Sequence, residues 1–246
     1  MAHKKISVQV AKSFGNFQCL RNIQFDVLEN EFLCLVGPSG CGKTVLMEII
    51  AGLMAPTQGK VTVDGEPIDP ARHNISLVFQ EPSCLPWRTV WDDIKFGLEI
   101  KGVDEKEAND RIERILEIVG LKGYEKYYPN QISGGMKQRV AIARAFVTYP
   151  DLLLMDEPFG HLDAQTRCFM QIEVLRIWEQ MKRTVIFVTN NVEEAVFLGD
   201  RVLAFSPPPM EVRAEVPIYL PRPRDVTEQK FLSLRKEITD FYEVSL

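Results

Sequence analysis

Residues 37–44 read Gly-Pro-Ser-Gly-Cys-Gly-Lys-Thr, and this stretch decides the fold. The apolar run Leu33 to Val36 precedes it, and a helical pattern of apolar residues follows it. The spacing G-x-x-x-x-G-K-T between a strand and a helix is that of a phosphate-binding loop. Glycines let the backbone turn tightly and point several N–H groups at one anion, and the helix start adds its positive end. The stretch predicts a site for a nucleoside triphosphate.

The residue types in this loop predict separate roles at the phosphates. Lys43 is expected to reach the β- and γ-phosphates, and the Thr44 hydroxyl is expected to hold Mg²⁺. The other residues expected to line the nucleotide are Gly37, Pro38, Ser39, Gly40, Cys41, Gly42 and Val45. The alternative is a chance glycine-rich turn, but the strand and helix patterns on either side favour the phosphate site.

Composition limits the other functions of the chain. Its 246 residues, 46% of them hydrophobic, can bury a sizeable core. The net charge of −5 argues against a nucleic-acid binder that relies on general phosphate attraction. The N-terminus lacks an apolar signal core and no run is long enough to span a bilayer, so a membrane role is expected to be peripheral. The five cysteines form no C-x-x-C pair and predict reduced thiols in the cytosol.

The apolar patterns predict a mixed α/β chain. Residues 6–10 and 23–27 alternate like the strands of a small antiparallel sheet, with a turn at 12–15 between them. Helical patterns dominate from 82 to about 150, where Asp104 and Glu107 are spaced as in a capping box. The further strands are expected at 59–65, 75–79, 152–155 and 184–189 and in a pair within the tail, and the further helices near 132–144, at 164–181 and from about 227.

Two carboxylates follow the apolar strand at 152–155. Asp156, at the end of a buried strand in a chain with a phosphate loop, is typical of a residue that positions magnesium. Glu157 could orient or deprotonate the attacking water. The alternative, that the pair merely begins a polar loop, is disfavoured by the phosphate loop in the same chain.

A second glycine-rich helix start reads Ser133-Gly-Gly-Met-Lys-Gln138. A single γ-phosphate does not need two such anion sites in one chain. Two chains packed head to tail do need them, because each would close the nucleotide site of the other. The sequence therefore predicts a dimer.

In this order the motifs resemble those of the ATPase subunit of an ABC transporter, over nearly the whole chain. The resemblance implies a P-loop NTPase fold with a RecA-like core, a small antiparallel β subdomain and an inserted helical subdomain, roughly residues 82–150, within a single domain spanning 1–246. It also implies a transport-coupled ATPase that uses ATP and Mg²⁺. The tail, roughly 206–246, is expected to carry no added regulatory domain.

The resemblance assigns further roles to residues of this chain. Phe14 is the aromatic expected to stack on adenine, and Gln80 is expected to touch Mg²⁺ and sense the membrane partner. Glu157 matches the catalytic base, and Asp163 the dimer-contact loop. The signature motif, which closes the ATP site of the partner chain, is matched by Ser133, Gly134 and Gly135. The magnesium ligands of the family are matched by Thr44, Gln80 and Asp156.

A narrower resemblance lies in residues 80–90, Q-E-P-S-C-L-P-W-R-T-V, and in the tail Pro221-Arg-Pro-Arg-Asp225. Both are similar to the nitrate, sulfonate and taurine importer group. This implies a peripheral subunit on the cytoplasmic face of the cell membrane, bound to transmembrane permease subunits that receive solute from a binding protein. Trp87, Trp91 and Phe96 could form a groove for a permease helix; the alternative for the last two is subdomain core.

Three positions depart from the family pattern. Asn30 replaces a glycine but tolerates left-handed φ, and His161 stands in the dimer-contact loop, as an exposed loop residue or at the partner's nucleotide. Asn190 replaces the switch histidine and Asn191 the usual Asp. Asn190 predicts a slow ATPase, and the alternative is a regulatory subunit with little or no hydrolysis. A DNA-repair or chromosome ABC ATPase is disfavoured, because the coiled-coil or zinc insertions of that class are missing.

Overall fold

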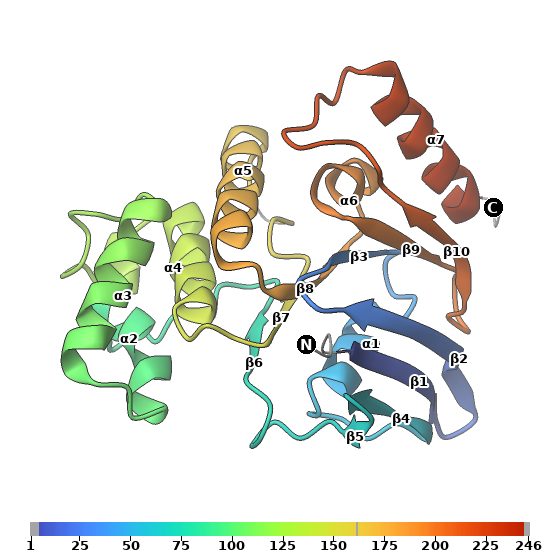
Figure 1. Cartoon of the computed structure of the whole chain (residues 1–246), viewed down its shortest axis with the longest axis horizontal. Coiled ribbons are helices and arrows are strands. Elements are labelled where there is room, and N and C mark those ends of the chain that lie inside the picture. Colours follow the sequence, from blue (N-terminus) through green and yellow to red (C-terminus); the bar gives the residue numbers. More distant parts are fainter. Residues whose placement is uncertain (1–4, 161, 244–246) are drawn as a thin grey trace. The chain divides into compact units, whose positions relative to one another are not determined.

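The computed structural model describes residues 5–160 and 162–243 (Figure 1). The chain divides into two compact units. Unit 1 is formed by the chain up to Ile75 and again from Arg183, and unit 2 by Ser76–Lys182. The single domain with a subdomain inserted at 82–150 stays a prediction.

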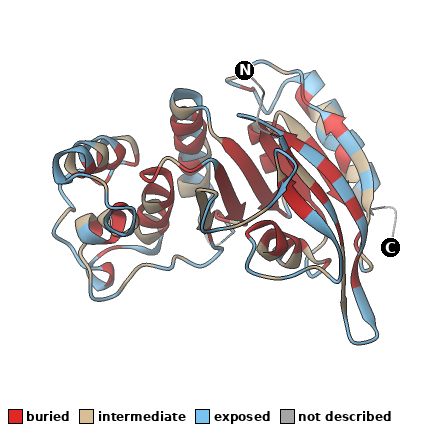
Figure 2. Cartoon of the chain, turned by 60° about the horizontal axis from the view of Figure 1, so that its bottom comes forward, coloured by how far each residue is buried: buried red, intermediate tan, exposed pale blue. Residues whose placement is uncertain are grey.

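Unit 1 contains an antiparallel sheet with the strand order β2-β1-β4-β5. Its strands are β1 (Lys5–Phe14), β2 (Phe17–Leu28), β4 (Gln58–Val63) and β5 (Glu66–Pro67). Buried and exposed residues alternate along β1 and β2, as Figure 2 shows, so one face of this sheet packs on the core. The expected turn at 12–15 was wrong, because β1 continues to Phe14 through register shifts between Val10 and Ser13, and the chain turns only at Gly15.

The second sheet of unit 1 is mainly parallel and has the order β10-β9-β3-β8. Its strands are β3 (Phe32–Val36), β8 (Thr184–Thr189), β9 (Arg201–Phe205) and β10 (Val212–Pro217). β3 runs parallel to β8 and to β9, whereas β10 is antiparallel to β9. Every residue of β3 and β8 is buried, which explains why both strands read as continuous rather than alternating apolar runs.

Among its described residues, unit 1 has the helices α1 (Lys43–Ile50), α6 (Val192–Leu198) and α7 (Gln229–Glu243). α6 and α7 lie against each other beside β3 and β9 (Figure 1). The predicted final helix begins two residues later than expected. Asn30 has φ 62°, as its place in a left-handed turn predicted.

Unit 2 combines two neighbouring strands with a helical layer. The elements are β6 (Ile75–Val78), β7 (Leu152–Asp156), α2 (Val90–Ile100), α3 (Glu105–Ile118), the short 3₁₀ helix η1 (Pro129–Gln131), α4 (Gly134–Phe146) and α5 (Ala164–Met181). Asp104 accepts N–H bonds from Lys106 at 3.0 Å and Glu107 at 3.4 Å, as predicted, but the Glu107 carboxylate pairs with Arg111. Within the described ranges, no helix has both the length and the apolar character that a bilayer crossing needs.

Candidate functional site

The phosphate loop lies between β3 and α1, where the sequence predicted it. Gly42 caps α1 with φ 121°, and its carbonyl accepts from the Leu46 N–H at 2.9 Å. A Cβ on Gly42 would lie 2.9 Å from Leu20 Cδ2 and 3.0 Å from Cys19 Sγ. Both the backbone angle and the lack of space therefore require glycine here.

The loop rests on an apolar floor. A Cβ on Gly37 would lie 3.0 Å from Cys41 Sγ and 3.2 Å from Phe205 Cβ, so the loop approaches β9 closely. The Cys41 thiol lies 3.6 Å from Met210 Sδ, and burial raises the pKa of this thiol. Cys41 therefore supports the loop as a small apolar side chain.

Lys43 is folded back over the loop. Its side chain is buried, with 5% of its surface exposed, and Nζ donates to the Gly37 carbonyl at 2.8 Å and to the Pro38 carbonyl at 3.0 Å. This arrangement fixes a positive charge beside the N-terminal end of α1. Gly42 supplies no side-chain cap and the first turn contains no acidic residue, so the helix start suits an anion. Ser39 and Thr44 are exposed beside it.

Asn190 lies next to the phosphate loop in the sheet. The Cα partners of the parallel pair β3 and β8 end with Val36 opposite Thr189. The next residue on each strand is Gly37 and Asn190, so both leave the same edge of the sheet at neighbouring positions. Asn190 is exposed. The register therefore brings the substituted switch position and the phosphate loop together within unit 1.

The backbone around Asn190 is held by its two neighbours. The buried Thr189 hydroxyl donates to Glu194 Oε2 at 2.6 Å and accepts from the Asn191 N–H at 3.0 Å. The Asn191 side chain caps α6 by accepting from the N–H groups of Glu193 and Glu194 at 2.9 and 3.3 Å. Asn190 thus occupies a short strand-to-helix junction with both sides fixed.

Phe14, the expected adenine contact, ends β1 and is 46% exposed. Lys12 Nζ lies 5.0 Å from the centre of its ring, and Phe17 is its cross-strand partner. The ring has an accessible surface on which a base could stack.

Unit 2 holds the carboxylates and the loop glutamine. β7 ends at the buried Asp156, and Glu157 follows with φ 43° in a turn closed by the Gly160 N–H bonding the Glu157 carbonyl at 3.0 Å. Gln80 Nε2 lies 3.6 Å from where a Cβ on Gly160 would stand. The structure therefore brings Gln80 to the loop that carries Glu157.

The signature residues and Asp163 of the dimer-contact loop lie at two adjoining helix starts in unit 2. Ser133 caps α4 and accepts from the Met136 N–H at 3.3 Å, while Asp163 caps α5 and accepts from the Thr166 N–H at 3.0 Å. The hydrogen bonds from Thr166 lower the pKa of Asp163. A Cβ on Gly135 would lie 3.1 Å from Thr166 Cγ2, so Thr166 joins the two motifs. Ser133, Gly134 and Asp163 are exposed, and His161 lies outside the described residues.

The predicted residues thus form two sets. Phe14, residues 37–45 and Asn190 belong to unit 1, whereas Gln80, Asp156, Glu157, Ser133, Gly134, Gly135 and Asp163 belong to unit 2. Among the described residues, no group of three or more His, Cys, Asp or Glu is arranged to hold a metal. The expected magnesium ligands, a hydroxyl, an amide oxygen and one carboxylate, are the hard oxygen donors that Mg²⁺ prefers when phosphate oxygens and water complete its shell.

Gln138 was not predicted as a site residue. It is 1% exposed, and its Nε2 donates to the Phe79 carbonyl at 3.5 Å, directly before Gln80. This contact links α4, which begins at the signature, to the segment that carries the loop glutamine. The sequence offered one signal for this contact, the position of Gln138 on the buried side of the helix that begins at the signature. A polar side chain on that side needs a hydrogen-bond partner.

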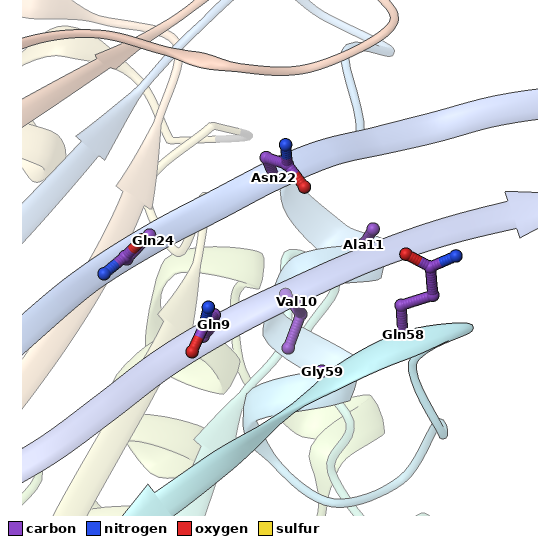
Figure 3. A pocket seen from close by; sticks show the side chains of 7 residues that line it. All are labelled: Gln9, Val10, Ala11, Asn22, Gln24, Gln58 and Gly59. Carbon is purple, nitrogen blue, oxygen red and sulfur yellow. The ribbon is translucent and has the colours of Figure 1, made fainter.

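A separate hollow of about 280 Å³ lies on the antiparallel sheet (Figure 3). It is lined by Gln9, Val10, Ala11, Asn22, Gln24, Gln58 and Gly59. Its polar side chains are uncharged amides, so it offers no fixed positive charge to a phosphate. The phosphate loop remains the site that suits a nucleotide.

Comparison with known proteins gives the family that the motifs indicated. The model of the family described as "ABC transporter" matches residues 20–160. An uncharacterized ABC transporter ATP-binding protein, MJ0412 of Methanocaldococcus jannaschii, is 50% identical over 90% of this chain and 83% of the relative. The aliphatic sulfonates import ATP-binding protein SsuB of Bacillus cereus is 42% identical over 97% and 94%. The nitrate import ATP-binding protein NrtD of a Synechocystis strain is 40% identical over 94% and 86%.

Solved structures of the cassette MJ0796 are also similar. Its dimeric structure has a TM-score of 0.77 and 30% identity, covering 88% of this chain and 99% of that one. A post-hydrolysis state bound to ADP and Pi has a TM-score of 0.76 and 29% identity, with the same coverage. Together with the phosphate loop, the signature helix and the mixed sheet, these findings show that the chain is an ATP-binding member of the ABC transporter family, with the P-loop ABC ATPase fold.

Proposed function

We propose that the chain is the ATP-hydrolysing subunit of an ABC importer that takes up a small anion such as a sulfonate, taurine or nitrate. The observation that carries the ATPase part is the register of β3 and β8, which sets Asn190 beside a phosphate loop whose lysine is already in place. The anion class is supported by relatives named for sulfonate and nitrate import. It is also supported by the resemblance of residues 80–90 to the nitrate, sulfonate and taurine importer group.

In this proposal the loop binds the phosphates and Lys43 neutralises the charge of the β- and γ-phosphates. Thr44, Gln80 and Asp156 would hold Mg²⁺, which when bound would supply further neutralisation of the phosphate oxygens. Glu157 orients the attacking water and accepts its proton. Its place in a turn directly after the buried β7 suits this role, because β7 fixes the backbone that carries the carboxylate.

Asn190 makes the enzyme slow in this proposal. A histidine there would donate a hydrogen bond to the γ-phosphate and carry charge when protonated. Asparagine keeps a neutral N–H donor on a shorter side chain. The loss of one preorganised donor at a developing charge typically costs about 10²–10³ in rate. The second candidate, a regulatory subunit that hydrolyses little or nothing, rests on the same substitution.

The proposed partners are a second copy of the chain and transmembrane permease subunits fed by a solute-binding protein. The dimeric MJ0796 cassette and the import subunit names of the relatives support them. The chain would then sit peripherally on the cytoplasmic face of the cell membrane.

The nucleotide assignment is tested by calorimetry with Lys43→Ala and, as matched control, Lys60→Ala, an exposed lysine on β4. Removing a charged hydrogen-bonding partner of the phosphates should weaken ATP binding by roughly 10- to 100-fold. The control should bind like the parent. Equal affinity in both variants would rule out the loop assignment.

The transport assignment is tested by deleting the gene in its own organism. Growth should fail with a sulfonate or taurine as the sole sulfur source, or with nitrate as the sole nitrogen source, and recover with the parent gene but not with the gene for Lys43→Ala. Normal growth on all of them would exclude this anion class.

A further inference from the structure

The tail motif Pro221-Arg-Pro-Arg224 encloses the C-terminal end of helix α6. Arg224 is 6% exposed, and its Nη1 donates to the carbonyls of Val196 and Gly199 at 2.6 Å each and of Phe197 at 3.1 Å. The last carbonyls of a helix have no partner within the helix, and a cation there is favourable. Burial lowers the pKa of Arg224 to about 10, so the group remains charged at neutral pH.

Arg222 extends the same contact to the strand that leads into the phosphate loop. It donates to the Leu198 carbonyl and, through Nη1, to Asp200 Oδ1 at 2.7 Å. Asp200 Oδ2 accepts from the Phe32 N–H at 2.9 Å, and the Asp200 N–H bonds the Phe32 carbonyl at 2.7 Å. Phe32 is the first residue of β3, so one connected set of bonds joins the tail, α6 and β3.

The other end of α6 is the junction that carries Asn190. The helix has seven residues and begins at the Asn191 cap. A helix this short depends on tertiary contacts for its stability. Its first turn is held by the Asn191 cap and by the bond from Thr189 to Glu194, which both lie inside the junction itself. Toward α7 it has a surface ion pair, Glu193 with Arg235 at 2.6 Å, in which both side chains are nearly half exposed. Such surface pairs contribute little. At the opposite end the buried Arg224 and the partly buried Arg222 bind four carbonyls between Val196 and Gly199, so they tie the helix to the rest of unit 1 more firmly than the surface pair does.

We propose that Arg224 and Arg222 are positioning residues for Asn190. By fixing α6 at its C-terminal end and tying it to β3, they hold the junction at residues 189–191 in register with the phosphate loop. The inference rests on the proposed function in one respect, the action of Asn190 on the γ-phosphate. It gives the tail motif a role in turnover rather than only in folding.

The first test measures α6 directly. Arg224→Lys keeps a charge but replaces the planar fork by a single ammonium. Hydrogen exchange followed by mass spectrometry should be faster in residues 192–199 of this variant. The matched control is Arg213→Lys, an exposed arginine on β10, which should leave that exchange unchanged. If Arg224→Lys does not fold, Arg222→Lys takes its place. Unchanged exchange in 192–199 would overturn the hold on α6.

The second test measures turnover with the same variants. Because a small misplacement of a catalytic group lowers the rate of the chemical step, Arg224→Lys should reduce kcat roughly three- to tenfold with less than a twofold change in KM for ATP. In an Asn190→Ala background the same substitution should have almost no further effect on kcat, because its target is gone.

The outcomes distinguish the positioning role of Arg224 and Arg222 from the action of Asn190 on the γ-phosphate. An equal drop in kcat in both backgrounds would mean a general structural role and would overturn the positioning of Asn190. Faster exchange in α6, combined with turnover that responds to neither substitution, would overturn the action of Asn190 in the proposed function, and the positioning role with it.

Discussion

At the scale of single residues, Asn190 offers the sharpest test because its backbone is already fixed. Asn190→His restores a longer side chain that can carry a proton, at an exposed position beside Gly37 in the sheet. Turnover should rise at least several-fold, within the roughly 10²–10³ that one oxyanion donor contributes. ATP affinity should change little, since Lys43 and the loop are untouched. Steady-state ATPase assays and calorimetry measure the two quantities.

Asn109→His is the matched control, because it adds a histidine on α3 of unit 2, and its turnover should equal that of the parent. Equal or lower turnover in Asn190→His would mean that the site has adapted to asparagine.

Single residues also show which features of the site could be predicted from the sequence. The phosphate loop, the cap Asp104, the helix start at 133–138 and the left-handed Asn30 were predicted, because each depends on a few neighbouring residues. The apolar floor that Met210 and Phe205 provide was not predicted. This floor consists of residues more than 160 positions away from the loop. The identity of a single apolar residue does not indicate which distant segment it will contact.

At the scale of elements, α2 and α4 are joined by an ion pair between the buried Asp93 and the partly buried Arg144. Arg144 Nη1 lies 2.7 Å from Asp93 Oδ1, and Asp93 Oδ2 accepts from the Leu85 N–H at 3.1 Å. Asp93→Ala would remove one partner of Arg144, which keeps its bonds to Ser83, and would leave the Leu85 N–H without its acceptor. Such a change typically costs about 1–3 kcal/mol of stability. Urea unfolding of the variant should give that loss. Asp110→Ala, an exposed aspartate on α3, is the control and should change stability by less than about 0.5 kcal/mol. A loss no larger than that of the control would show that the pair contributes little.

The segment before α2 presents the surface expected to bind the permease. Trp87 is 72% exposed, whereas Trp91 lines a cavity with α3 and Phe96 lies under Arg88, 4.7 Å from its guanidinium. Trp87 is therefore the aromatic best placed to bind a partner helix. Trp87→Ala should weaken binding to the detergent-solubilised permease subunits at least roughly 30-fold, as for a hot-spot tryptophan, with unchanged ATP affinity.

Tyr219→Ala serves as control for this surface, because Tyr219 is 89% exposed but belongs to unit 1. Normal assembly of Trp87→Ala would move the permease site away from this segment.

Elements were predicted unevenly. The limits of α5 and β8 matched, since the polar residues Asp163 and Lys182 flank α5 and a threonine stands at each end of the apolar run of β8. α6 was missed because seven residues span only two turns, too few to establish a period. The contacts of Arg222 and Arg224 with α6 could not be predicted either. Both bind backbone carbonyls, which every residue has, so the sequence does not indicate which residues they contact.

At the scale of the whole molecule, the exposed signature predicts an ATP-dependent dimer. Ser133 caps α4 at the surface, and Gly134 is open beside it: apart from its chain neighbours and the backbone of its own helix, no described atom lies within 4 Å of where its Cβ would stand. Asp163 begins the adjoining helix, also exposed. This surface suits the γ-phosphate of ATP bound to a second copy of the chain, and the related MJ0796 cassette has a dimeric structure.

Glu157→Gln should trap this dimer, because the amide cannot take a proton from water and bound ATP is retained. Sedimentation velocity at saturating ATP should then show dimers, and monomers should remain without nucleotide. Adding Ser133→Arg should abolish dimers while ATP binding to the monomer persists, since the added side chain would occupy the space of the partner's phosphate. The control adds Ser233→Arg, at an exposed serine on α7, and should still dimerise. Dimers that persist with Ser133→Arg would mean that the chains meet through another surface, and monomers of Glu157→Gln at high protein concentration would mean that ATP alone does not join them.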